Sequence, residues 1–222
     1  MAEKKTKATD MEAALEQTFV EKNIKKIGAF IAVVLVVVLA CIGWNYYSDS
    51  RNQKAAEALF PCEQLFQKGD YEKALNGDGQ EILGLVEVAK KFGATKSGNL
   101  AKLYAGLAYA QTGKMEEAEK MLNDFSTRDD EMVSPAALGA LGNVQAELGQ
   151  LDKAVETLKK AAKKADNTVL SPLFLVQAGE ILESQGKADD ALKLYEQVRD
   201  NYRGSQQGQE IDKYIERIKA AK

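Results

Sequence analysis

Three stretches of sequence decide the fold: Gly106-Leu-Ala-Tyr-Ala-Gln-Thr-Gly113, Gly142-Asn-Val-Gln-Ala-Glu-Leu-Gly149 and Gly179-Glu-Ile-Leu-Glu-Ser-Gln-Gly186. In each stretch two glycines stand seven residues apart, and an alanine follows five residues after the second glycine. A large apolar or aromatic residue comes four residues after that alanine. The second glycines recur at intervals of 36 and 37 residues, which indicates an internal structural repeat.

The repeated small residues fit a pair of packed helices joined by a tight turn. The first glycine of each stretch removes a side chain where two helices approach closely, and the second supplies a turn residue with positive φ. The alanine then lies in the second helix, where the first helix presses against it. The repeat-structural residues are therefore Gly106, Gly113, Ala118, Gly142, Gly149, Ala154, Gly179, Gly186 and Ala191.

This pattern resembles the tetratricopeptide repeat (TPR), a helix–turn–helix unit of about 34 residues. The resemblance implies an α-solenoid of about four helical hairpins closed by a C-terminal capping helix. The residues in excess of 34 are assigned to connections such as 126–133. The TPR domain is expected over 54–222, with units near 54–92, 99–126, 135–165 and 172–202 and a cap at 206–221.

The first of these units matches the pattern less well than the other three. Cys62 stands at the small position and Gly69 at the turn, but Asn76-Gly-Asp-Gly79 interrupts the second helix. A new helical run is expected over 81–92. Pro61 falls inside the first helix and is expected to kink it.

An apolar segment precedes the repeats and completes an all-α fold. Residues 27–47 contain no ionisable side chain apart from Cys41 and two tyrosines, and as a helix they cover roughly 32 Å, enough to cross a hydrocarbon core. Trp44, Tyr46 and Tyr47 fall where an interfacial aromatic belt would lie. Lysines crowd the other end, which predicts a cytoplasmic tail at 1–26, a transmembrane helix at 27–47 and a short connection at 48–53.

Two other interpretations of the apolar segment stay open. A buried helix of a soluble protein rarely keeps such a long run free of charge. Val38-Leu-Ala-Cys41 looks like a lipoprotein cleavage box, which would make Cys41 a lipidation site. Against processing, the region before the apolar run is long and carries five acids, whereas a signal peptide begins with a short basic region.

Composition excludes several classes of function. The 222 residues include no His and two Cys, with 30 basic against 33 acidic residues for a net charge of −3. A His-ligated metal centre, a His general base and a Cys–His pair are therefore impossible within the chain. The near-neutral charge argues against duplex nucleic acid as the main ligand. We expect no enzyme, cofactor, metal site, nucleic-acid partner or small-molecule substrate.

Two local features are explained by structural roles. The stretch 76–81 superficially suggests a calcium loop, but no register that keeps three oxygen ligands also provides the required Gly and Glu, so a helix-breaking turn is expected. Cys62 stands at a packing position and Cys41 lies in the apolar segment, so Cys62 is expected to be a buried free thiol.

In the TPR family, side chains of the first helix of each unit line a concave groove that binds protein segments. Carried over by register, the resemblance implies a protein-binding groove lined by Leu103, Tyr104, Leu107, Gln111, Asn143, Glu147, Val176, Gln177 and Glu180. Leu103 and Leu107 could equally be core residues. The Lys and Asn residues with which one subclass clamps a C-terminal carboxylate are absent at the matching positions. A mixed apolar and weakly acidic groove would suit a helix or an extended segment of a partner.

The whole layout resembles the YfgM-like family of membrane-anchored TPR proteins, as does the stretch from Gly93 to Gly106 that leads into the first good repeat. The resemblance implies a scaffold or adaptor at the periplasmic face of the bacterial inner membrane, ancillary to the protein-export translocon and periplasmic chaperones. Its partners would be membrane-embedded export machinery, periplasmic chaperones or exported chains. A holdase chaperone for exported chains and an envelope-assembly lipoprotein are the alternatives. The short connection at 48–53 would hold the groove near the membrane surface.

Overall fold

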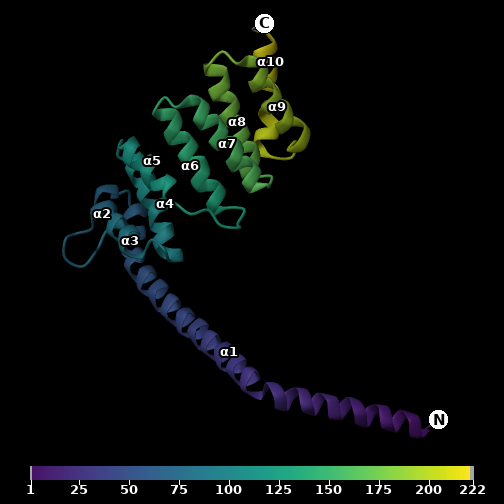
Figure 1. Ribbon diagram of the computed structural model, residues 1–222. Coiled ribbons are helices and arrows are strands. Elements are labelled where there is room, and N and C mark those ends of the chain that lie inside the picture. The colour runs from purple at the N-terminus through teal and green to yellow at the C-terminus, as the bar shows by residue number, and fades with distance from the viewer. Residues whose placement is uncertain (1, 221–222) are drawn as a thin grey trace. The chain divides into compact units, whose positions relative to one another are not determined.

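The protein is all-helical, as predicted. A computed structural model describes the backbone of residues 2–220 and the side chains of residues 23–220, and no strand occurs among them. The described helices are shown in Figure 1. They are α1 (Ala2–Gln67), α2 (Tyr71–Asn76), α3 (Leu85–Phe92), α4 (Lys96–Gln111), α5 (Met115–Asn123), α6 (Val133–Glu147), α7 (Leu151–Ala165), α8 (Leu170–Ser184), α9 (Ala188–Asn201) and α10 (Gln206–Ala220).

The chain divides into two units, Met1–Ser50 and Arg51–Lys222. The first unit contains a window of 18 residues with a mean hydropathy of 2.8, none of which is buried within the described chain. Val36 is 66% exposed and Trp44 is 70% exposed. This part of α1 is long and apolar enough to cross a membrane. The side chains of residues 1–22, within the predicted tail, lie outside the described residues.

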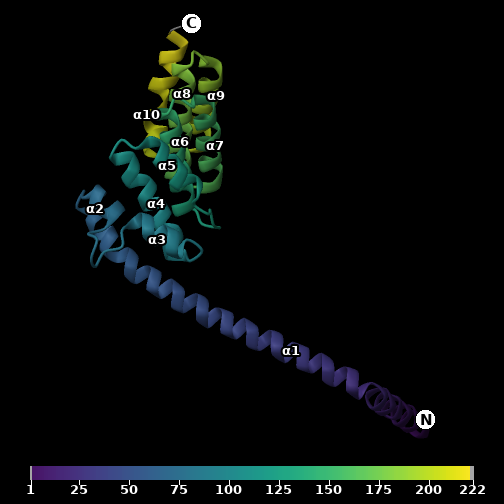
Figure 2. The ribbon, with the colours of Figure 1, turned by 60° about the vertical axis from the view of Figure 1, so that its left-hand side comes forward.

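The second unit is a series of helical hairpins, which Figure 2 shows from a second side. The hairpins pair α4 with α5, α6 with α7, and α8 with α9. Each turn contains a glycine with positive φ, at 76° for Gly113, 73° for Gly149 and 73° for Gly186. Gly69 follows α1 with a φ of 82° and precedes α2.

The first hairpin, formed by the C-terminal part of α1 and by α2, differs from the others in its second helix. α2 ends at Asn76, where Gly77 takes a φ of 74°. The carboxylate of Asp78 then accepts hydrogen bonds from the backbone N–H groups of residues 80, 81 and 82. Gly84 then takes a φ of 79°, which an α-helix cannot contain, so the next helix begins at Leu85 rather than at residue 81 as the sequence predicted. Pro61 lies inside α1, and its predicted kink stays a prediction.

The helices of the second unit form an inner and an outer row. α4, α6, α8 and α10 each pack against the next member of that series, and we call them the inner row. Helices α5, α7 and α9 pack mainly against inner-row helices, with side-chain contacts such as the ion pair of Lys153 and Glu119 between α7 and α5, and we call them the outer row. A series of hairpins that touch on one side and spread on the other is curved, with the inner row on its hollow side.

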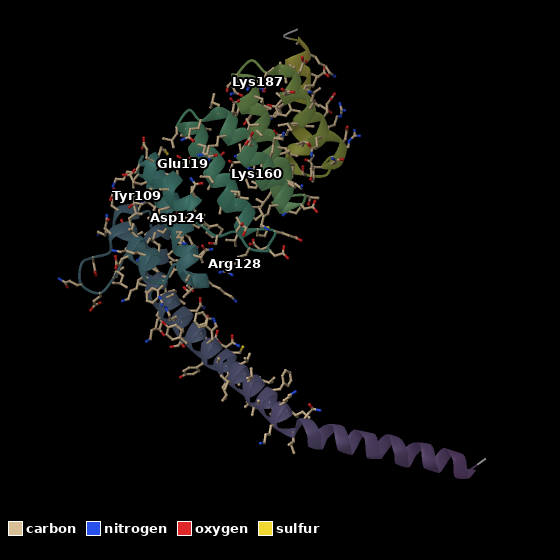
Figure 3. All side chains as sticks on the ribbon, in the orientation of Figure 1. Tyr109, Glu119, Asp124, Arg128, Lys160 and Lys187 are labelled. Carbon is tan, nitrogen blue, oxygen red and sulfur yellow. The ribbon has the colours of Figure 1, made fainter. Side chains whose placement is uncertain are left out.

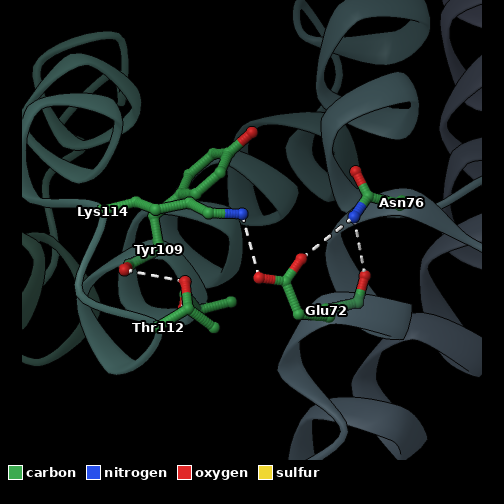
Figure 4. Close-up of polar contacts among 6 residues, drawn as sticks. Glu72, Asn76, Tyr109, Thr112 and Lys114 are labelled. Atoms are coloured by element: carbon green, nitrogen blue, oxygen red, sulfur yellow. Dashed lines mark hydrogen bonds and ion pairs between the residues drawn. The ribbon is translucent and has the colours of Figure 1, made fainter.

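Polar contacts repeat between successive hairpins. The residue directly after each turn glycine reaches a carboxylate on the second helix of the hairpin before it. These pairs are Lys114 with Glu72 at 2.9 Å, Gln150 with Glu119 at 3.0 Å and Lys187 with Asp152 at 2.6 Å. Figure 4 shows the first pair, in which Glu72 also accepts from the side chain of Asn76. Glu119 and Lys187 can be located in Figure 3.

Candidate functional site

The candidate site is a groove on the inner row, built by two cavities that share residues. The α6–α8 cavity has a volume of about 480 Å³ and is lined by Asn143, Ala146, Glu147, Gln177, Glu180, Ile181 and Ser184. The α8–α10 cavity has a volume of about 250 Å³ and is lined by Leu173, Val176, Gln177, Glu180, Gln206, Gln207, Glu210 and Tyr214. Because Gln177 and Glu180 line both, the cavities form one continuous surface, which we call the inner groove.

Local sequence explains why these side chains face the groove. Gly142 and Gly179 face Leu158 and Tyr195 of the outer row, which turns those faces of α6 and α8 toward the outer helices. The residues directly after these glycines, Asn143 and Glu180, and Glu147 one turn beyond Asn143 are left on the hollow side, where all three are exposed. Val176 is only 7% exposed and forms part of the apolar floor. The groove thus combines an apolar floor with polar walls, the usual composition of a binding surface.

The groove carries negative charge. Glu147 and Glu180 form no ion pair with any described cation, whereas Glu210 is paired with Lys213 on its own helix. No Lys or Arg lines either cavity. Helices α6 and α8 contain no basic residue at all. No described basic side chain therefore neutralises the carboxylates of Glu147 and Glu180, and both are available to a partner.

One buried acceptor in the groove lacks a donor. The Oε1 atom of Gln177 is inaccessible to solvent and has no hydrogen-bond partner among the described residues. Gln177 lines both cavities, so this atom lies at their junction. Buried polar atoms in proteins are normally hydrogen-bonded, because an unpaired one costs roughly 1–3 kcal/mol.

The structure brings together five of the nine groove residues predicted from the sequence: Asn143, Glu147, Val176, Gln177 and Glu180. The remaining four lie on α4, in the first good repeat. Leu103 is 8% exposed and belongs to the core with Ala118 and Leu122, while Leu107 packs partly against the same core. Gln111 is exposed near the end of α4.

Tyr104 lies in an aromatic cluster with the first hairpin. Its ring meets that of Phe66 edge-on, with centroids 5.2 Å apart. Burial raises the pKa of the Tyr104 hydroxyl, and the nearby carboxylate of Glu63 adds to the rise. Burial also raises the pKa of Glu63, against the opposing hydrogen bond from Tyr104. This cluster joins the first two hairpins.

Sequence reasoning missed the contribution of α10. Gln206, Gln207, Glu210 and Tyr214 line the α8–α10 cavity, although α10 was expected only to close the array. Three isoleucines of α10, at 211, 215 and 218, are at most 3% exposed, so the helix does cover the last hairpin. The same helix also continues the inner row, and this follows from its packing against α8.

A larger cavity of about 680 Å³ lies in the outer row between α7 and α9. Lys159, Lys160 and Lys163 line it, and Figure 3 labels Lys160 there. Lys163 stands in the last turn of α7, where the helix dipole favours a cation. Lys159 lowers the pKa of Asp190 in part, behind the larger contribution of Lys193. Lys159 and Lys163 therefore have a structural explanation.

The described residues offer little for catalysis or metal binding. No group of three or more Cys, Asp or Glu side chains among them is placed to hold a metal ion. Cys41 and Cys62 are both free thiols, and Cys62 is fully buried. Burial raises the pKa of Cys62, which keeps the thiol protonated and unreactive.

Comparisons with known proteins agree with this geometry. Residues 17–218 match the family described as "Tetratricopeptide repeat-like domain". The ancillary SecYEG translocon subunit of Aggregatibacter actinomycetemcomitans is 29% identical over 175 residues, which cover 78% of this chain and 81% of that protein.

Two solved structures share the fold. Both are Podosopora anserina proteins with nearly identical, kinesin-light-chain TPR-like repeats, and one carries the substitution Q17M in its own numbering. The substituted protein aligns with a TM-score of 0.55 at 16% identity, over 76% of this chain and 94% of its own. The other aligns with a TM-score of 0.53 at 16% identity, over 77% and 97%.

Proposed function

Because this chain belongs to the tetratricopeptide repeat-like domain family, we propose that it is a membrane-tethered adaptor that binds other proteins as an ancillary component of a protein-export translocon. The observation that carries the proposal is the similarity to a protein named as an ancillary SecYEG translocon subunit. The fold supports a role in protein binding, since stacked helical hairpins present extended concave surfaces.

The proposed location is the bacterial inner membrane, crossed once by α1. The unburied apolar window supports this, because an exposed apolar surface of that size would be unstable in water. Lysines at positions 22, 25 and 26 support an N-terminus in the cytoplasm and a repeat unit in the periplasm. Protease added to spheroplasts should then digest residues 51–222; protection of that unit until lysis would contradict the orientation.

The proposed mode of action is binding without catalysis. The inner groove would hold a segment of a partner, either of the export machinery, of a periplasmic chaperone or of an exported chain. Its apolar floor at Leu173, Val176 and Tyr214 also supports direct binding of unfolded exported chains, a holdase activity. Suppression of aggregation of a denatured client by the 51–222 unit alone would favour the holdase.

Site-specific photo-crosslinking in intact cells tests the adaptor proposal. A photoreactive residue at Asn143 in the inner groove should capture translocon components or newly exported proteins. The same residue at Lys160 in the outer row is the matched control and should capture them less. Capture of only soluble proteins that never contact the membrane would overturn the proposal. Intact-mass measurement at Cys41 tests the lipoprotein alternative in the same cells.

A further inference from the structure

We infer that the inner groove selects extended protein segments that carry Lys or Arg at alternate positions. This inference rests on the proposed function, because it specifies what the adaptor's groove recognises. It goes beyond protein binding in general by fixing the charge and the backbone conformation of the bound segment.

The charge of the segment follows from the groove's unneutralised carboxylates. Glu147 lies on α6 and Glu180 on α8, and both line the α6–α8 cavity without a described cation partner. The adjoining α8–α10 cavity adds Glu210, which Lys213 partly neutralises. An acidic segment would be repelled here, while a basic one gains electrostatic complementarity, which governs specificity and the association rate.

The extended conformation follows from Gln177. Its buried Oε1 atom needs a hydrogen-bond donor, and the described residues provide none. In a helix the main-chain N–H groups are used internally, apart from those of the first turn. An extended segment leaves its main-chain N–H groups free to donate into a groove. A donor of that kind can satisfy Gln177 at the junction of the two cavities once its partly buried side chain turns the amide oxygen toward the groove.

The alternate spacing follows from the geometry of an extended chain. Successive side chains point to opposite sides, so residues two apart share a side and are separated by roughly 7 Å. Neighbouring packed helices lie about 8–10 Å apart. In the repeat register Glu180 matches Asn143, so Glu147 lies one helical turn further along its helix. The long side chains of Lys or Arg let two basic residues separated by one other residue reach both carboxylates. The intervening side chain would face away, and flanking apolar residues would meet Val176 and Leu173 on the floor.

The test compares labelled peptides by fluorescence anisotropy with the full chain in a non-ionic detergent. The first probe is an extended peptide of alternating Lys and Val, with acetyl and amide ends to remove terminal charges. A second probe has Glu in place of each Lys. A third keeps the length and the number of Lys residues of the first but replaces Val by Ala and arranges the residues in a helix-forming order. We expect the first probe to bind most tightly, with an affinity that falls as salt rises.

Variants of the full chain assign the binding to the groove. Glu147→Gln and Glu180→Gln should each weaken binding of the Lys–Val peptide by roughly 3- to 10-fold, and Gln177→Leu by a similar factor. Glu156→Gln on α7 is the matched control, since it removes the same charge from the outer row and should have no such effect. Thermal unfolding monitored by circular dichroism shows that each variant is folded.

The inference is wrong if the Glu-containing or the helical probe binds as tightly as the Lys–Val peptide. It is also wrong if the two groove glutamates matter no more than Glu156. Its failure can be told apart from failure of the proposed function. If Asn143 crosslinks to translocon components but the basic peptide does not bind, the adaptor proposal stands. Only the inference that the groove selects basic, extended segments then fails.

Discussion

Single glycines set how closely the paired helices approach. A Cβ atom on Gly106 would lie 2.6 Å from Cγ of Leu122, and one on Gly142 would lie 2.7 Å from Cγ of Leu158. In the last hairpin, a Cβ atom on Gly179 at the same position would lie 2.3 Å from Cε1 of Tyr195. The large residue nine positions after each turn glycine therefore fills the space that the missing side chain leaves.

We expect Gly142→Ala to lower the free energy of unfolding by about 1–3 kcal/mol, because Leu158 is fully buried and has little room to move. Urea unfolding of the 51–222 unit measures the change. A double-mutant cycle with Leu158→Ala supplies the control: in that background the added methyl group should cost less. Equal costs in both backgrounds would show that the contact with Leu158 is not the cause.

Tyr195 makes the last hairpin sensitive to alkaline pH. Its side chain is fully buried and its hydroxyl donates to Oε2 of Glu183 at 2.7 Å. Burial, reinforced by Glu183, raises the pKa of Tyr195 well above its usual range. Stability from this group is thus complete below a pH of about 10, the ordinary pKa of tyrosine, and is lost as pH rises beyond it.

Tyr195→Phe should therefore cost about 1 kcal/mol at neutral pH, through loss of the hydrogen bond. The difference between the two proteins should narrow above pH 10, because the Phe variant has no hydroxyl to ionise in the unfolded state. Urea titrations at several pH values measure this. A difference that widens with pH would contradict the assignment.

At the scale of single elements, the loops before α6 and α8 hold the starts of those helices in the same way. Asp130 accepts hydrogen bonds from the backbone N–H and the hydroxyl of Ser134. Asn167 accepts from the N–H groups of Val169 and Leu170 ahead of Ser171. Burial opposes ionisation of Asp130, but its hydrogen bonds outweigh that effect and lower its pKa.

Asp130→Ala should lower stability by about 0.5–2 kcal/mol at neutral pH, as loss of a helix cap does. Because the pKa of Asp130 is lowered in the folded state, its contribution is present above a pH of about 4 and is lost as pH falls further. The deficit of the variant should shrink in acid. Asp129→Ala, at the exposed neighbouring carboxylate, is the control and should be nearly neutral in chemical unfolding experiments.

The elements were predictable where spacing alone specifies them. The hairpins of α4 to α9 follow from glycines and alanines at fixed intervals, because a close helix contact and a tight turn tolerate few other residues. The start of α3 was misplaced by four residues. The sequence 81–84 has an acceptable helical pattern, but the carboxylate of Asp78 binds its N–H groups and Gly84 takes a φ of 79°.

The groove was harder to predict than the fold. The repeat register predicted Asn143, Glu147 and Gln177 on the inner row, where the structure has them, and their role in binding stays a prediction. The repeat register could not show whether Leu103 lies at the surface or in the core, because that depends on how the next hairpin packs over α4. Nor could it assign Tyr214 to the groove, because a capping helix has no repeat partner to set its register.

At the scale of the whole molecule, the polar pairs between successive hairpins fix how the hairpins are aligned more than they stabilise the folded state. Exposed ion pairs such as Lys187 with Asp152 contribute little to stability, because water and salt screen the two charges. Their recurrence after each turn glycine, however, favours one alignment of neighbouring hairpins over a shifted one. The curvature of the inner row, and with it the groove, depends on that alignment.

Membrane attachment should depend on the middle of the apolar segment. Val36→Lys places a charge near the centre of the predicted span, where it costs roughly 2.5–3.5 kcal/mol. We expect much of this variant to leave the membrane fraction on alkaline extraction. Ile24→Lys adds the same charge beside Lys25 and Lys26, at the predicted cytoplasmic end, and should remain in the membrane fraction. Equal extraction of the two variants would argue against a spanning helix.

The packing pattern has a consequence for biogenesis. Every packed pair of helices from α2 to α10 is separated along the chain by at most one other helix. Local contacts of this kind form quickly and need no distant segment. Each hairpin can thus pack against the preceding hairpin as the chain is synthesised, and α10 completes the domain. A polypeptide stalled before α10 would expose the ring of Tyr195 and leave the groove without its last wall, even though most of its hairpins had formed.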